Sequence, residues 1–256
     1  MLSFKFPQHF ELLFLLVQKD LKARYKNSFL GYLWALANPF AFALVYYIAF
    51  KIIMRVEMPN YSIFLLAGMF PWVWMTNSIV QATSSYRANP FLVKKVRMNT
   101  LILPLANVAH ELIHFCFALP VLLAFILFTG GEFYLSWFWQ IPVMVLLQLM
   151  LVYPMALLLG IANVFVHDVE YLVGIFISLL FFLTPIVYPV SMVPEAYRGY
   201  FEYSPFAAII LNWRSVLIEG NIGLAGFAYC FGLAILLLFV AKKVHQRVSF
   251  KLAELL

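Results

Sequence analysis

The chain has 256 residues, of which 65% are hydrophobic and 11% are charged, and its mean hydropathy is +0.93. This composition excludes an ordinary soluble domain. The net charge of +6 does not indicate nucleic-acid binding either, because the basic residues flank apolar segments, as they do at the cytoplasmic face of a membrane. We expect an all-α polytopic membrane protein, folded as a single transmembrane domain over residues 1–256.

The chain opens on an amphipathic segment, 7–26, that ends in a basic elbow. Between Pro7 and Lys22, apolar residues recur at helical spacing and charged residues face away. Such a helix lies in the plane of the membrane interface with its apolar face among lipid headgroups. The elbow consists of Arg24, Tyr25 and Lys26, which we expect at the cytoplasmic interface.

Six apolar runs predict transmembrane helices, since about 20 residues cross a hydrocarbon core of roughly 30 Å. Their expected ranges are 30–54, 61–84, 101–128, 137–165, 169–188 and 222–241. A basic loop at 85–100 follows the second run, and the segment 189–220, cut by prolines, precedes the sixth. Segment 189–220 is suited to short or re-entrant helices rather than to a transmembrane span. Residues 242–256 form a basic tail.

The lysines and arginines predict the orientation. With both termini in the cytoplasm, 13 of the 17 basic residues fall on the cytoplasmic side. This distribution satisfies the positive-inside rule.

One pentapeptide, His110–His114, fits the H-E-x-x-H pattern of zinc proteases. Two imidazoles four residues apart share a helix face and can bind zinc, with Glu111 as general base. A third ligand from another span is not evident, so we predict no metal. The alternative is that His110, Glu111 and His114 form hydrogen bonds between helices or line a wet cavity.

No other catalytic motif is recognisable. The sequence contains no phosphate-binding G-x-x-x-x-G-K-[ST] loop and not even one Gly-Lys pair. ATP and Mg would therefore belong to another chain, and we expect this chain to bind no cofactor.

Aromatic residues are abundant. The ordinary interpretation is interfacial belts, to which we assign Trp72, Trp74, Trp137 and Trp139. A more specific pattern is an aromatic stripe in the first and fifth runs. Rings along a pore can stack on the C–H faces of sugars, so these residues are our candidates for lining a substrate channel: Phe42, Tyr46, Phe50, Phe181, Phe182 and Tyr188.

Three stretches resemble the permease subunit of type-two ABC exporters of polysaccharides and polyol phosphates, the group of the O-antigen and teichoic acid exporters. They are Asp20–Trp34 continuing to Asn38-Pro39, then Phe181–Pro189, then Pro205-Phe206 followed by Trp213–Leu217. Ser204 departs from the family pattern, since Asn is usual before that proline.

The resemblance implies a homodimer of six-span subunits in a bacterial inner membrane, with the glycan path between the two copies. Each copy would dock on an ATP-binding cassette subunit through a coupling helix at about Ser85–Asn99. Segment 189–220 would gate the outer end of the channel. The coupling residues would be Arg87, Asn89, Pro90, Phe91, Lys94 and Lys95.

We therefore predict a permease, not an enzyme, that exports a long, lipid-linked, O-antigen-like polysaccharide for lipopolysaccharide biosynthesis. Two alternatives remain open at this point. One is an intramembrane zinc metalloprotease using His110, Glu111 and His114, and the other is a polytopic transferase acting on lipid-linked sugars.

Overall fold

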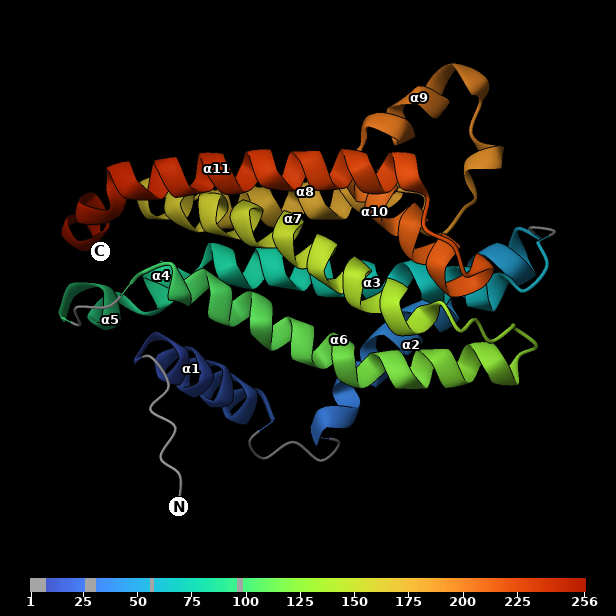
Figure 1. Cartoon of the computed structure of the whole chain (residues 1–256), viewed down its shortest axis with the longest axis horizontal. Coiled ribbons are helices and arrows are strands. Elements are labelled where there is room, and N and C mark those ends of the chain that lie inside the picture. Colours follow the sequence, from blue (N-terminus) through green and yellow to red (C-terminus); the bar gives the residue numbers. More distant parts are fainter. Residues whose placement is uncertain (1–7, 26–30, 56–57, 96–98) are drawn as a thin grey trace.

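The computed structural model describes residues 8–25, 31–55, 58–95 and 99–256. All regular structure within these ranges is helical, which confirms the predicted all-α class (Figure 1). The long helices run roughly side by side, and the C-terminus lies at the same end of the bundle as α4 and α5.

The helices follow the apolar runs of the sequence. Their bounds are α1 Gln8–Tyr25, α2 Trp34–Tyr47, α3 Tyr61–Thr83, α4 Ser85–Ala88, α5 Pro90–Lys95, α6 Ile102–Phe128, α7 Trp137–Phe165, α8 Val169–Leu183, α9 Glu195–Tyr203, α10 Pro205–Arg214 and α11 Leu224–Leu255. Short 3₁₀ turns, η1 and η3, cover Gly31–Leu33 and Val190–Met192. Widened π-type turns, η2 and η4, cover Ile48–Ile53 and Ser215–Glu219.

Four described helices, α3, α6, α7 and α11, are long and apolar enough to cross a membrane. The apolar helices in the first and fifth expected spans, Phe40–Ile53 and α8, are shorter. Part of the first expected span, at Leu30, lies outside the described residues. The structure is therefore that of a polytopic membrane protein, while six complete crossings remain a prediction.

Helix α3 forms the centre of the bundle, where it packs against α2, α6, α7, α8 and α10. Most of its side chains are buried, including Trp72 and Trp74. Trp74 stacks on Phe115, with 4.9 Å between ring centroids, and Trp137 donates its indole N–H to the Val216 carbonyl at 2.8 Å. The prediction that these three tryptophans form interfacial belts is wrong, because protein surrounds them; Trp139 alone among the four is exposed.

The expected fifth span, 169–188, ends five residues early. Helix α8 stops at Leu183, and Thr184 is extended, with φ −103° and ψ 137°. Thr184 precedes Pro185, whose ring disfavours helical geometry in the residue before it. The segment from Thr184 onward is thereby free to turn across the end of α3.

The expected coupling helix, Ser85–Asn99, is also broken. Asn89 has φ −131° and ψ 49° and separates α4 from α5. It again precedes a proline, Pro90, which begins the second helix. The residues after α5 up to Met98 lie outside the described ranges.

At the other end of the bundle, α9 projects away from the long helices (Figure 1). Helix α10 begins with Pro205 and is capped by Ser204, whose hydroxyl oxygen accepts from the Ala207 backbone N–H at 3.4 Å. Serine is among the residues preferred at this capping position. Helix α11 does not stop at the expected residue 241 but continues through the basic tail to Leu255.

A close approach between α3 and α7 requires glycine at position 160. A Cβ on Gly160 would lie 2.9 Å from the Ala82 carbonyl oxygen and 3.4 Å from the Tyr86 ring. Alanine favours helix by about 1 kcal/mol over glycine, but forcing apart packed backbones costs typically 1–3 kcal/mol. We expect Gly160→Ala to lower the free energy of unfolding, measured by thermal melting in detergent.

The matched control is Gly232→Ala in α11, where nothing lies within 4 Å of an added Cβ. This variant should be neutral or stabilising. If Gly160→Ala stabilises the protein as much as Gly232→Ala does, the close approach of α3 and α7 is not a constraint.

Candidate functional site

The aromatic candidates on α2 and α8 meet at one contact. The rings of Tyr46 and Phe181 lie 5.0 Å apart between centroids, and Phe182 lies edge-on to Phe181 at 5.3 Å. Tyr188 donates its hydroxyl proton to the Phe182 carbonyl at 2.8 Å, which ties the segment after α8 back onto that helix. These four residues form one aromatic cluster.

The remaining two aromatic candidates lie on either side of this cluster along the first span. Phe42 is half exposed, at 50%, whereas Phe50 is partly buried against the core. Phe181 is itself largely buried and also contacts Trp72 in α3. The stripe is therefore partly core packing, with Phe42 and Phe182 as its exposed members.

Helices α4 and α5, with the C-terminal turns of α11, form what we call the basic end of the bundle (Figure 1). Most of the predicted coupling residues are exposed there: Arg87, Pro90, Phe91 and Lys94. Asn89 is half-buried and donates to the Ser85 carbonyl at 2.9 Å. Lys95 is the last residue of α5, and its side chain lies outside the described part.

Two polar contacts join the basic end to other helices. Lys19 of α1 donates to the Asn89 side-chain oxygen at 3.5 Å. Arg87 of α4 lies 4.0 Å from the carboxylate of Glu170, in the first turn of α8. Exposed pairs of this kind contribute little to stability, roughly 0–1 kcal/mol. They show which helices meet here: α1, α4 and α8.

The predicted basic elbow is described only in part. Arg24 and Tyr25 are the last residues of α1, but their side chains lie outside the described part, as does Lys26 altogether. Helix α1 packs against α6.

The His110–His114 pentapeptide forms a buried polar network. The Nε2 atoms of the two histidines are 3.2 Å apart, and Nδ1 of His110 lies 3.2 Å from Oε1 of Glu111. Two amides on α3 hold this carboxylate: Gln81 donates to Oε1 at 2.5 Å and Asn77 donates to Oε2 at 3.3 Å. Buried carboxylates need such partners.

The same three residues, His110, Glu111 and His114, form the group of potential metal ligands in the described part of the chain, with ligand atoms within 4.8 Å of one another. All three come from one helix, and the absence of a metal stays a prediction. The predicted alternative role, hydrogen bonding between helices, is what the Asn77 and Gln81 contacts show.

A polar cavity of about 530 Å³ lies beside this network, between α1, the end of α3, α4 and α6. Polar side chains dominate its wall. They are Lys19, Asp20, Gln81, Ser84, Ser85, Asn89, Asn107 and His110. Sequence reasoning did not find this cavity, because its residues come from three separated stretches of the sequence.

Sequence reasoning also missed the role of Arg214, a buried arginine at the end of α10. Its Nε donates to the Phe64 carbonyl at 3.1 Å, and its two terminal nitrogens donate to the carbonyls of Pro185 and Ile186. The guanidinium lies 3.5 Å from the centroid of the Phe64 ring. One side chain therefore joins α10, α3 and the turn after α8.

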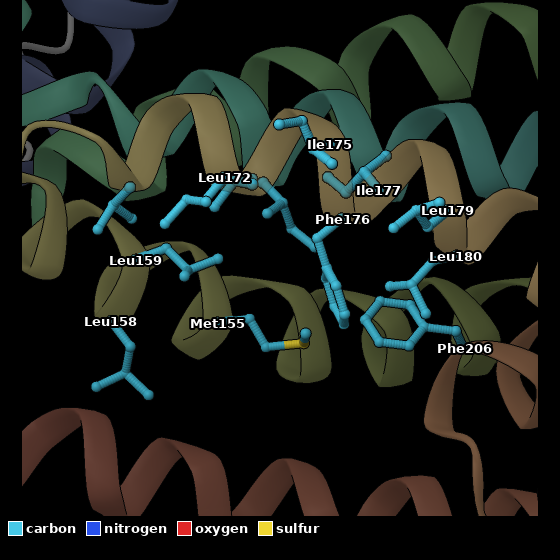
Figure 2. A pocket seen from close by; sticks show the side chains of 13 residues that line it. Met155, Leu158, Leu159, Leu172, Ile175, Phe176, Ile177, Leu179, Leu180 and Phe206 are labelled. Carbon is cyan, nitrogen blue, oxygen red and sulfur yellow. The ribbon is translucent and has the colours of Figure 1, made fainter.

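An apolar groove of about 660 Å³ runs between α7 and α8 (Figure 2). Met155 and Leu159 line it from α7, and Leu172 and Phe176 line it from α8. Its lining residues are hydrophobic throughout and provide no hydrogen-bonding side chain. Such a groove does not suit a glycan.

Known proteins match this chain over most of its length. The profile of the ABC-2 type transporter family matches residues 11–218. An O-antigen export system permease protein from Klebsiella pneumoniae is 37% identical over 96% of this chain and 95% of its own. One from Myxococcus xanthus is 33% identical over 83% and 82% of the two chains.

A polysialic acid transport protein from Escherichia coli is more distant, at 25% identity over 80% of each chain. These matches support neither the intramembrane protease nor the lipid-linked sugar transferase. The family match covers most of α1, all of the central helix α3, and Arg214. The chain belongs to the membrane-subunit family of ABC-2 type transporters.

Proposed function

We propose that the chain is the permease of an ATP-driven exporter that moves a polysaccharide across the bacterial inner membrane. The observation that supports this most strongly is the similarity to O-antigen export permeases across nearly the full length of both chains. The several long apolar helices suit a transporter subunit. The cargo would be a long, lipid-linked glycan of the O-antigen type.

The working unit of this proposal is a homodimer with two ATP-binding cassette subunits. The chain has no phosphate-binding loop, so ATP and Mg would bind to those partner subunits. The basic end would face the cytoplasm, in keeping with the positive-inside rule. It would then receive the ATPase through α4 and α5.

The contacts around the basic end suggest how force would enter the bundle. ATPase closure would push α4 and α5, which touch α1 through Lys19 and Asn89 and α8 through Arg87 and Glu170. Helix α8 carries Phe181, whose ring meets Tyr46 of α2. A shift of α8 would therefore move the aromatic cluster directly.

The channel in this proposal runs past the exposed members of the aromatic stripe. We expect a Phe42→Cys variant to lose export after treatment with a bulky thiol reagent, because the adduct would obstruct the path. The matched control is Ile235→Cys in α11, where the native side chain is similarly exposed, at 49% against 50%. Equal export by both treated variants would argue against Phe42 lining the channel.

The proposed function is tested in cells that lack the chain. Lipid-linked glycan should accumulate on the cytoplasmic side, and re-expression should restore glycan on the surface only when the partner ATPase is active. Surface glycan that persists without the chain would contradict the proposal.

A further inference from the structure

We infer that the polar cavity at the basic end is a binding site for a neutral sugar unit. The permease would bind its glycan there through hydrogen bonds before the glycan enters the aromatic channel. This inference rests on the proposed function and names a substrate-binding site within it. The cavity's volume, about 530 Å³, falls within the range of roughly 300–1,000 Å³ typical of small-molecule sites.

Ser85 of the cavity wall carries unused hydrogen-bonding capacity. It is 1% exposed, and its hydroxyl oxygen has no hydrogen-bond partner among the described residues. A buried polar atom without a partner costs about 1–3 kcal/mol, so this hydroxyl on the cavity wall points to a ligand that bonds it.

The chemistry of the wall favours hydroxyl groups over phosphate. Sugar hydroxyls both donate and accept, which matches the amides of Gln81, Asn89 and Asn107 and the serine hydroxyls. A phosphate favours a net positive site with several charged donors. Here the single lysine, Lys19, is paired with Asp20 at 3.2 Å, so these two charges cancel.

The cavity's position gives the bound sugar access to the moving parts. Asn89 lines the cavity and also forms the break between α4 and α5. His110 lines it and belongs to the network that joins α6 to α3 through Glu111. A sugar in the cavity would therefore touch both the segment proposed to receive the ATPase and the centre of the bundle.

The test measures direct binding to the permease–ATPase complex in lipid nanodiscs. The probes are radiolabelled polyprenyl diphosphate carrying a neutral disaccharide and the same carrier without sugar. We expect the sugar to tighten binding about tenfold or more. Ser85→Ala should weaken binding of the sugar-bearing probe roughly five- to tenfold, which is the effect of losing one hydrogen bond. It should leave binding of the sugar-free carrier unchanged.

Ser85→Ala suits this purpose because its hydroxyl has no protein partner among the described residues, so the fold loses nothing by its removal. Asn107→Ala is the second variant, should Ser85→Ala fail to fold, and should weaken binding similarly. The control is Ser78→Ala, a buried serine of α3 that does not line the cavity and whose hydroxyl bonds the Trp74 carbonyl of its own helix.

Three outcomes would overturn the inference. Equal binding of both probes to the wild type would exclude sugar recognition. Unchanged binding in both Ser85→Ala and Asn107→Ala would place the sugar elsewhere. An equal loss for the sugar-free carrier would assign the cavity to the diphosphate headgroup. The proposed function is judged separately, by whether the wild-type complex shows ATP-dependent export.

Discussion

Arg214→Ala is expected to lower the free energy of unfolding by about 3–5 kcal/mol, among the largest effects of any single substitution in this chain. The guanidinium donates to three backbone carbonyls, those of Phe64, Pro185 and Ile186, and is 6% exposed. Its removal leaves these buried acceptors short of a donor and opens a cavity against the Phe64 ring. The measurement is thermal or denaturant unfolding of the purified protein in detergent.

Arg214→Lys should recover only part of this loss, because a compact ammonium cannot reach three carbonyls in the fork geometry of a guanidinium. The matched control is Arg198→Ala. Arg198 also donates to two backbone carbonyls, those of Val193 and Ser191, but its side chain is 42% exposed and lies on the projecting α9. A loss for Arg214→Ala no larger than that for Arg198→Ala would contradict the proposed clamp.

Phe91→Ala is expected to reduce the affinity for the partner ATPase by about 30-fold to several hundred-fold, with little change in the permease's own stability. Phe91 lies on α5 at the basic end and is 61% exposed. An aromatic anchor that becomes buried in an interface commonly contributes 2–4 kcal/mol, and each 1.4 kcal/mol is a tenfold change. Binding of the purified ATPase to the permease in nanodiscs measures this directly.

The control for this experiment is Phe250→Ala, which removes another exposed aromatic side chain, 86% exposed, from the C-terminal turns of α11 at the same end. It should bind the ATPase as the wild type does. Equal weakening by both substitutions would indicate nonspecific apolar contact, and normal binding by Phe91→Ala would remove α5 from the interface.

Hydropathy predicted the long helices well because membrane burial selects apolar residues along their whole length. Ranges 61–84, 101–128 and 137–165 lie within one residue of α3, α6 and α7 at each end. The errors at α8 and at the coupling segment share a cause that the sequence does contain. Thr184 and Asn89 each precede a proline, and each ends or interrupts a helix there.

Side-chain environments were harder to predict than helices. Tryptophan suits both interfacial belts and a packed core, and nothing in the hydropathy of α3 distinguishes the two, so the assignment of Trp72 and Trp74 was wrong. The polar cavity could not be predicted, since Lys19, Ser85 and His110 come together only through tertiary packing. Arg214 gave one usable signal, a charge inside an apolar segment, which is a functional or structural marker by default.

The proposed function requires that this permease moves a glycan when a partner chain hydrolyses ATP. The most direct measurement reconstitutes the permease with its ATPase into sealed vesicles and follows a labelled lipid-linked polysaccharide. We predict that ATP drives the glycan across the membrane, while a hydrolysis-deficient ATPase or an omitted permease abolishes the movement. Glycan that stays on its original side in the complete system, with ATP being hydrolysed, would contradict the account.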